Sequence, residues 1–249
     1  MNELERVERE AVRSVVVAAG GVTSDVGGAM CSAYPPLREH PILNRAMPVN
    51  AHVDLDAIES FFEAAGTSFV VAVRPRLASL NRELDGRGYR RAGGWTKFSR
   101  DASPAPRVAS DLEITAAGPT DAQAFADVLM EGFGGAPQGR DVWTQVPGLR
   151  GWHCFLARDG REPAAAGALF VDGDVGWLGA AATRPSFRRR GAQSALLATR
   201  VDRARELSVR TLTVETGEPV EGQPGGSYRN ILQAGFREEY VRANWLSPR

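Results

Sequence analysis

Two segments of this chain, far apart in the sequence, have similar patterns, and this repetition constrains the fold more than any other feature. LNRELDGRGYRRAGGWTKFS begins at Leu80, and YRNILQAGFREEYVRANWLS begins at Tyr228. Each predicts a short helix, a glycine, an aromatic residue, basic residues and a strand that carries a tryptophan. A strand-like segment precedes each one, FVVAVRP in the first half and TLTVETGEP in the second. The pattern predicts an internal duplication whose first copy has diverged; the alternative is that any α/β chain ends its elements in this way.

The boundary between the two halves is predicted in SRDASPAPRVAS, residues 99–110. Two prolines, several small residues and the lack of periodicity are typical of a linker. A chain of 249 residues suits either one large domain or two small ones. We therefore expect one domain over residues 1–105 and a second over residues 111–249.

Composition excludes several classes of function. Lys and Arg total 30, as do Asp and Glu, so the chain lacks the excess of cations that a general nucleic-acid-binding protein needs. The two cysteines and three histidines have no metal-ligand spacing, so neither a metal site nor a disulfide framework is expected. Neither a signal peptide nor an apolar run of membrane-spanning length is present, which predicts a cytoplasmic protein without membrane contact.

The second half predicts the order β-α-β-β-β-α-β-α-β. Turns at Asp159–Gly160 and Asp172–Gly173 indicate an antiparallel meander of three strands. The fold class is therefore α/β, with a mixed, mostly antiparallel central sheet flanked by helices. Two helices have apolar positions on one face, Phe125, Val128, Leu129 and Phe133 in the first and Leu197, Val201 and Ala204 in the second.

Three consecutive arginines, Arg188 to Arg190, stand before Gly191 at the junction of a strand and a helix. The first N–H groups of a helix and its positive dipole end form an anion site, which arginines strengthen. Glycine lets the backbone approach a ligand closely. A solvated basic turn is the alternative, but cations at this helix end oppose the dipole, and a bound anion would relieve that cost. The turn thus predicts a pyrophosphate cradle.

The segment ATRPSFRRRGAQSALL resembles the acetyl-CoA-binding motif of the GCN5-related N-acetyltransferases, the GNAT superfamily. Thr183-Arg184-Pro185 stands where the family has V-x-P at the end of a strand, and Arg188 and Gly191 match the Arg/Gln-x-x-Gly pattern. Gln193 departs from the Gly or Ala that is usual there. SYRNILQAGF is similar to the family's next signature, Ser-x-Arg before Gly-Phe. The resemblance covers Asp111 to Trp245 and implies tandem GNAT-like domains, of which the first is degenerate.

The resemblance implies that acetyl-CoA is the co-substrate and lies in a split between the fourth and fifth strands of the second domain. The backbone near Ala182 would pair with the pantetheine and stabilise the oxyanion, and the amides after Arg188 would hold the pyrophosphate. The first copy lacks the arginine-glycine pattern, so we expect it to bind no CoA and to have a structural or substrate-shaping role. The implied contact residues are Ala181, Ala182, Thr183, Arg188, Arg189, Arg190, Gly191, Ala192, Gln193, Ser194 and Asn230.

The resemblance leaves the acid and the base open. Relatives carry a carboxylate base on the fourth strand, but none lies between Trp177 and Thr183, so Glu215 at the end of the next strand is the candidate. It is equally well explained as a surface charge. The family's tyrosine acid falls at Ile231; Tyr228, one turn earlier, could substitute or merely pack. Ser227 is a third candidate, or a helix cap.

Three further side chains have simpler explanations. His153 is a lone histidine on a strand, which is more often structural. Trp143 and Trp152 flank the side from which an acceptor would enter, but core packing explains both.

The sequence therefore predicts an N-acetyltransferase that moves an acetyl group from acetyl-CoA to a small-molecule amine or a protein amino group. Two alternatives remain. One is an acyl-CoA-binding sensor without turnover. The other is different CoA-thioester chemistry, because small residues from Gly179 to Ala181 leave the choice of acyl group open. No nucleic-acid partner is expected, and a homodimer is left open.

Overall fold

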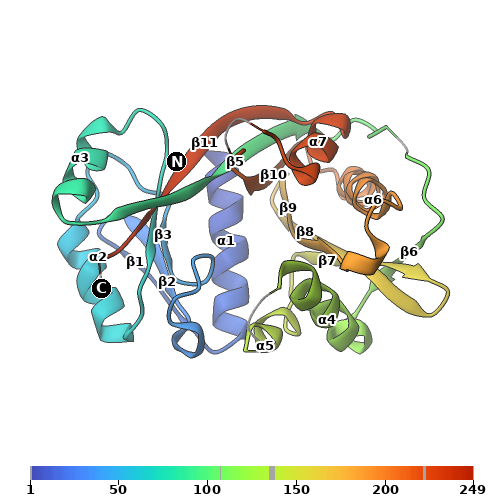
Figure 1. The fold of residues 1–249 in the computed structure, drawn as a ribbon, viewed down its shortest axis with the longest axis horizontal. Coiled ribbons are helices and arrows are strands. Elements are labelled where there is room, and N and C mark those ends of the chain that lie inside the picture. Colours follow the sequence, from blue (N-terminus) through green and yellow to red (C-terminus); the bar gives the residue numbers. More distant parts are fainter. Residues whose placement is uncertain (1, 107, 135–137, 221–222, 249) are drawn as a thin grey trace. The chain divides into compact units, whose positions relative to one another are not determined.

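The computed structural model describes residues 2–106, 108–134, 138–220 and 223–248. It divides into two compact units. The first unit contains Met1–Lys97 together with Glu239–Arg249, and the second contains Phe98–Glu238. Each unit is a layer of strands covered by helices, and each is described separately below (Figure 1).

Up to its last helix, the second unit follows the predicted element order, with three short helices in addition; most of the predicted last strand belongs to the first unit. The strands of the second unit lie in the order β10-β9-β8-β7-β6, antiparallel except for the parallel pair β9 and β10. Asp159–Gly160 and Asp172–Gly173 form the two predicted turns, and both glycines have positive φ. Its elements are β6 (Glu113–Ala117), η2 (Pro119–Asp121), α4 (Ala122–Phe133), α5 (Gly139–Trp143), β7 (Trp152–Asp159), β8 (Glu162–Asp172), β9 (Val175–Thr183), η3 (Pro185–Phe187), α6 (Ala192–Glu206), β10 (Thr211–Gly217) and α7 (Gly226–Gln233).

Helices α4 and α6 cover opposite faces of the β7–β9 sheet (Figure 1). On the α6 face, Leu197, Val201 and Ala204 are buried, as their spacing predicts, against β-strand residues such as Leu169. Of the apolar positions of α4, Phe125, Val128 and Leu129 are buried. The fourth position was predicted wrongly, because Phe133 is 54% exposed at the helix end.

The first unit repeats part of this order. Its strands lie in the order β1-β2-β3-β4-β11, with β3 and β4 parallel and the other pairs antiparallel. The series β1-β2-β3-α2-β4-α3-β5 has the same sequence of elements as β7-β8-β9-α6-β10-α7-β11, which supports the predicted duplication. Its elements are α1 (Glu3–Ala18), β1 (Val22–Val26), β2 (Ala29–Ala33), η1 (Pro35–Leu37), β3 (Arg45–Met47), α2 (Leu55–Ala65), β4 (Val70–Val73), α3 (Ala78–Gly86), β5 (Arg90–Asp101) and β11 (Arg237–Leu246).

The observed division differs from the predicted boundaries at 105 and 111. It falls within β5 and within β11, so the last strand contributes to the first unit, where Trp245 pairs with Val71 of β4. The end of β5 contributes to the second unit, where the Phe98 carbonyl accepts a hydrogen bond from Thr213 of β10. A sequence pattern shows where strands are, but it does not show which unit a strand joins.

The predicted linker is likewise corrected at its start, because residues 99–101 belong to β5. Arg100 holds this segment in place: its guanidinium donates to the carbonyl of Ala234 at the end of α7 and to that of Ser103. The ring of Phe236 lies 5.5 Å from the same guanidinium. Ala105 is also buried, against the α6 core. A run that reads as a flexible linker is therefore partly packed, because one arginine satisfies carbonyls at a helix end.

A buried group of charges holds α1 in the first unit. Glu8 is fully buried and contacts Lys97, Arg242 at 2.6 Å and Arg45 at 3.5 Å. Glu5, one turn earlier, accepts hydrogen bonds from Arg242 at 2.9 Å and from Tyr240. Burial alone would raise the pKa of Glu8, but the charges of Arg242 and Lys97 outweigh it and hold the pKa well below its ordinary value. Both carboxylates are therefore ionised and paired.

Replacing Glu8 by Ala should destabilise the protein severely, because the buried cations would lose their main counter-charge. We expect a loss of about 3–5 kcal/mol in the free energy of unfolding. Urea unfolding followed by far-UV circular dichroism measures it. The matched control is Glu10→Ala on the same helix, whose carboxylate pairs with Arg9 and Arg13 near the surface and contributes about 0–1 kcal/mol. Equal losses for the two variants would contradict the assignment.

Candidate functional site

The parallel strands β9 and β10 separate part-way along their length. Their pairing runs from Thr211 opposite Val175 to Val214 opposite Leu178. Beyond this point β9 continues to Thr183 and β10 to Gly217 without further pairing between them. The backbone of β9 from Gly179 to Thr183 therefore has one edge without a strand partner among the described residues. Backbone N–H and C=O groups in such a place need hydrogen-bond partners from elsewhere.

A β-bulge marks the point of separation. Ala168 of β8 pairs with Gly179, and the next pair is Ala166 with Ala182, so β9 has an extra residue here. Ala180, with φ of 45°, adopts a conformation that non-glycine residues rarely take. A bulge turns backbone groups out of the ladder, and bulges are common beside active sites. The geometry thus directs unpaired backbone groups of β9 into the split.

The arginine-glycine turn lies at the mouth of the same split. After β9, the short helix η3 leads to Arg189 and Gly191, which have φ of 65° and 76°. Gly191 is the N-cap of α6, so the first N–H groups of that helix lie just after it. The turn is not open on both sides: a Cβ on Gly191 would lie 2.6 Å from the Ala109 carbonyl oxygen. Only glycine combines a positive φ with the absence of a Cβ that this close contact requires.

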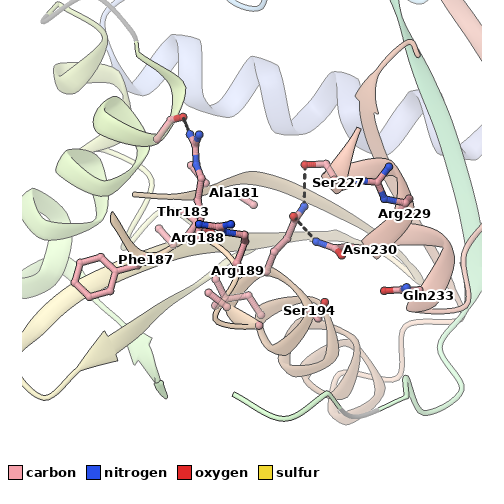
Figure 2. A pocket seen from close by; sticks show the side chains of 18 of the residues that line it. Ala181, Thr183, Phe187, Arg188, Arg189, Ser194, Ser227, Arg229, Asn230 and Gln233 are labelled. Carbon is pink, nitrogen blue, oxygen red and sulfur yellow. Dashed lines mark hydrogen bonds between the residues drawn. The ribbon is translucent and has the colours of Figure 1, made fainter. Parts of the chain in front are cut away.

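These features line one pocket of about 670 Å³ (Figure 2). Its charged lining side chains are Arg188, Arg189, Arg200 and Arg229, and it has no carboxylate in the part of the chain that is described. The pocket is therefore suited to a polyanion. The structure brings together Ala181, Ala182, Thr183, Arg188, Arg189, Gly191, Ala192, Gln193, Ser194 and Asn230, all of them predicted contact residues.

Gln193, which departs from the family pattern, has a definite place. Its side-chain amide donates to the Ser227 hydroxyl at 3.0 Å, and its carbonyl accepts from the Asn230 amide at 2.7 Å (Figure 2). It thereby joins the first turn of α6 to the first turns of α7. Ser227 was considered as a helix cap, and this is corrected: the N-cap of α7 is Gly225.

The predicted role of the Arg190 side chain is also corrected. Its guanidinium pairs with Asp111 and, at 2.7 Å, with Asp159, and it stacks 5.5 Å from the centre of the Phe187 ring. Arg190 is not among the residues that line the pocket. Asp111 lies just before β6 and Asp159 at the end of β7, and these two carboxylates attract the Arg190 guanidinium away from the start of α6. Arg189, by contrast, lines the pocket and makes no ion pair within the described residues.

The two predicted acid–base residues lie in different surroundings, and neither lines the pocket. Glu215 is the first β10 residue after the last pair with β9, beside the point of separation. Tyr228 stacks edge-on against Phe98, and its hydroxyl donates to Glu238, which raises the pKa of the phenol and weakens it as a proton donor. Ile231, at the family's tyrosine position, is buried in the core.

The other side chains that could take part in chemistry have surroundings typical of a structural role. His153 lies on the α6 side of β7, opposite Leu169, and burial lowers its pKa. Burial raises the pKa of each thiol, Cys31 and Cys154, to about 12, so neither is a thiolate at neutral pH. Trp152 packs against Phe170 and Trp177. Trp143 contacts Phe133, whose exposed ring lines the pocket.

Helix α2 of the first unit corresponds to α6 in element order but begins differently. Its N-cap is Asp54, whose carboxylate accepts a hydrogen bond from the Ala57 amide at 3.1 Å. A side chain of the protein thus occupies the place where α6 offers free amides to a ligand. Negative charge at this position opposes the binding of a phosphate.

Ten of the lining residues are not among the predicted contacts: Gly132, Phe133, Ala166, Phe187, Leu196, Arg200, Gly226, Ser227, Arg229 and Gln233. Gln233 follows the predicted contact Asn230 by three residues and Arg229 by four, a helical spacing that could have indicated it. Nothing in the sequence pattern indicates Arg200, which stands inside an apolar helix face.

Among the described residues, no three or more His, Cys, Asp or Glu side chains are grouped in a way that could hold a metal ion. Among the helices that the structure describes, none combines the length and apolar character of a membrane span.

Comparison with known proteins assigns the second unit. Residues 123–222 match the profile of the Acetyltransferase (GNAT) family. A GCN5-related N-acetyltransferase from Kribbella flavida is similar over 100% of this chain and 97% of its own, with a TM-score of 0.70 and 14% identity. One from Sphaerobacter thermophilus has a TM-score of 0.63 and 18% identity over 78% of this chain and 66% of its own.

A tandem GNAT protein from the clavulanic acid biosynthesis pathway has a TM-score of 0.56 and 14% identity over 76% of this chain and 66% of its own. At these identities the solved structures establish the fold alone. A comparison with curated protein sequences found no match. The profile match agrees with the motif around Gly191, and residues 123–222 are therefore assigned as a domain of the Acetyltransferase (GNAT) family.

Proposed function

We propose that the protein is an acetyl-CoA-dependent N-acetyltransferase whose acceptor is a small-molecule amine or a protein amino group. Acetyl-CoA is a substrate of this reaction, and the second unit holds it. The observation that carries the proposal is the free edge of β9 beside the anion-binding start of α6. A molecule that binds both needs an extended chain with amide groups and a phosphate-rich end, which is the composition of CoA.

The residues around the split fit such a substrate. The amides after Gly191 and the guanidinium of Arg189 would hold the pyrophosphate, and the β9 backbone from Ala181 to Thr183 would pair with the pantetheine amides. The thioester would then lie near the bulge at Ala180, where N–H groups turned out of the ladder can stabilise negative charge on the carbonyl oxygen.

The reaction follows from this placement. The neutral amine attacks the thioester carbonyl, a C–N bond forms, the C–S bond breaks, and the proton lost by the amine balances the thiolate that leaves. Glu215, next to the point of strand separation, is the proposed base that removes this proton, directly or through water. Tyr228 is not assigned as the acid, because its hydroxyl is bonded to Glu238.

A second function, binding of acyl-CoA without turnover, is favoured by this same location of Tyr228, since no phenol lines the described pocket. Release of CoA thiol from acetyl-CoA in the presence of a panel of amines separates the two functions. Thiol release that depends on the amine identifies an enzyme; tight binding without release identifies a sensor.

Replacing Arg189 by Gln should weaken CoA binding about tenfold, because one charge-assisted hydrogen bond to phosphate is lost. Isothermal titration calorimetry with CoA measures the change. The control is Arg190→Gln at the next position, where the guanidinium is held by Asp111 and Asp159, and the affinity should change less than about twofold. A larger loss for Arg190 than for Arg189 would overturn this arrangement of the cradle.

Replacing Glu215 by Gln should lower turnover by about 10²–10⁴-fold at neutral pH while leaving CoA affinity unchanged, because the amide cannot accept the proton. The pH dependence of turnover is the sharper measurement: the parent loses activity in acid as its base becomes protonated, and the variant lacks this limb. If both proteins have the same rate at every pH, Glu215 is not the base, and the enzyme works by positioning and oxyanion stabilisation.

A further inference from the structure

Arg200 of α6 is a buried cation that lines the pocket. Its side chain is only 1% exposed. It runs back toward the start of the helix, as long helical side chains do, and its Nε donates to the Leu196 carbonyl at 3.0 Å. Nη1 donates to the Ala168 carbonyl at 3.2 Å and lies 3.5 Å from the Gly179 carbonyl oxygen. Nη2 has no hydrogen-bond partner among the described residues.

This guanidinium has no carboxylate partner in the described part of the chain, although buried arginines normally have one. The contrast with the first unit is direct, because the buried Arg242 there faces both Glu5 and Glu8. Burial lowers the pKa of Arg200 to about 10, so the group is still cationic at neutral pH. Three carbonyl oxygens satisfy part of its hydrogen bonding but not its charge.

The position of Arg200 corresponds to the reacting end of the pocket, not to the phosphate end. The carbonyls that it contacts belong to Ala168 and Gly179, the pair that borders the bulge. Gly179 lies about 13 Å along β9 from Thr183, at ~3.3 Å per residue, and Thr183 is beside the cradle. Arg188 and Arg189 stand in the turn before α6 and Arg229 in the first turn of α7, whereas Arg200 lies two turns into α6 and is buried.

Small residues lie beside Arg200 and in the pocket that it lines. Gly167 lies directly against the guanidinium, where a Cβ would be 3.1 Å from the Arg200 Cζ atom, so its lack of a side chain makes room for the arginine. The nearby lining residues Ala166 and Ala181 have only methyl side chains. A pocket that is bordered by small residues and contains a buried cation without a carboxylate partner among the described residues is complementary to a short chain that ends in an anion.

We propose that Arg200 recognises a carboxylate at the end of the acyl group, so that the preferred donor is a CoA thioester of a dicarboxylic acid rather than acetyl-CoA. This inference rests on the proposed CoA site and changes only the acyl group that is transferred. The chemistry of transfer is unchanged: the C–N bond forms at the thioester carbonyl, CoA thiol leaves, and the distal carboxylate stays ionised. We assign the carboxylate to the acyl group rather than to the acceptor amine, because a thioester held along β9 would have its acyl end at the bulge.

The test is calorimetric binding of five ligands to the full chain without any acceptor: CoA, acetyl-CoA, butyryl-CoA, malonyl-CoA and succinyl-CoA. Butyryl-CoA matches the carbon chain of succinyl-CoA but lacks its distal charge. The parent should bind succinyl- or malonyl-CoA about tenfold more tightly than butyryl- or acetyl-CoA. Arg200→Gln should remove this difference and change the affinity for CoA itself less than about twofold.

The control variant is Arg205→Gln on the same helix, where the side chain is exposed and pairs only weakly with Asp202 at 3.4 Å; it should keep the preference. Arg200→Lys, which retains the charge, should keep part of it. The parent's own selectivity decides the question even where Arg200→Gln does not fold. Equal affinity of the parent for succinyl-CoA and butyryl-CoA, or a preference that survives Arg200→Gln, overturns the proposal.

Two further outcomes have separate meanings. If CoA binds but the parent does not discriminate among the acyl groups, the assignment of Arg200 fails and the proposed CoA site stands. If CoA itself does not bind, the proposed function fails, and the acyl assignment with it. Discrimination that appears only when carboxylated amines are added to acetyl-CoA places the carboxylate on the acceptor and also overturns the acyl assignment.

Discussion

The hydrogen bonds of backbone groups on β9 are the constraint on which the rest of the site depends. From Val175 to Leu178 these groups have partners in β10, and from Gly179 onward they lose them on that side. The strand does not collapse onto its neighbour because the bulge at Ala180 and the packing of Gly132 against Ala182 fix its course. Backbone polar groups need hydrogen-bond partners, so we expect a ligand to complete the sheet in this split.

The two halves differ at the start of the helix that corresponds between them. Both place a helix after a strand whose next neighbour is parallel, in β3-α2-β4 and in β9-α6-β10. In the second unit the helix begins after Gly191 with free amides, whereas in the first it begins at Asp54, which caps its own helix. A carboxylate at the cap and the lack of the arginines both oppose anion binding at this helix, so we expect the first unit to lack the proposed site while it keeps the same order of elements.

Element order, the meander turns and ten of the residues that line the pocket could be predicted from the sequence, because glycine and the apolar spacing of α6 report local conformation. Side-chain direction could not. Arg188, Arg189 and Arg190 are alike in the sequence, but only the third is attracted to Asp111 and Asp159, which are distant in the chain. The position of the Arg200 side chain could not be predicted either, since it depends on carbonyls of two strands. The linker prediction failed at its start because Arg100 anchors an otherwise featureless segment to α7.

The composition of the first unit has a consequence for the order in which the chain folds during synthesis. Its buried charges include Arg242, and its β4 edge is covered by residues of β11, both of which are made after the whole of the second unit. Until those residues emerge, Glu5 and Glu8 have no Arg242 to face and β4 is an exposed edge. The first half to be translated is therefore the last to be completed, and contacts across most of the chain length close it, which makes its assembly slow and leaves it open to mispairing.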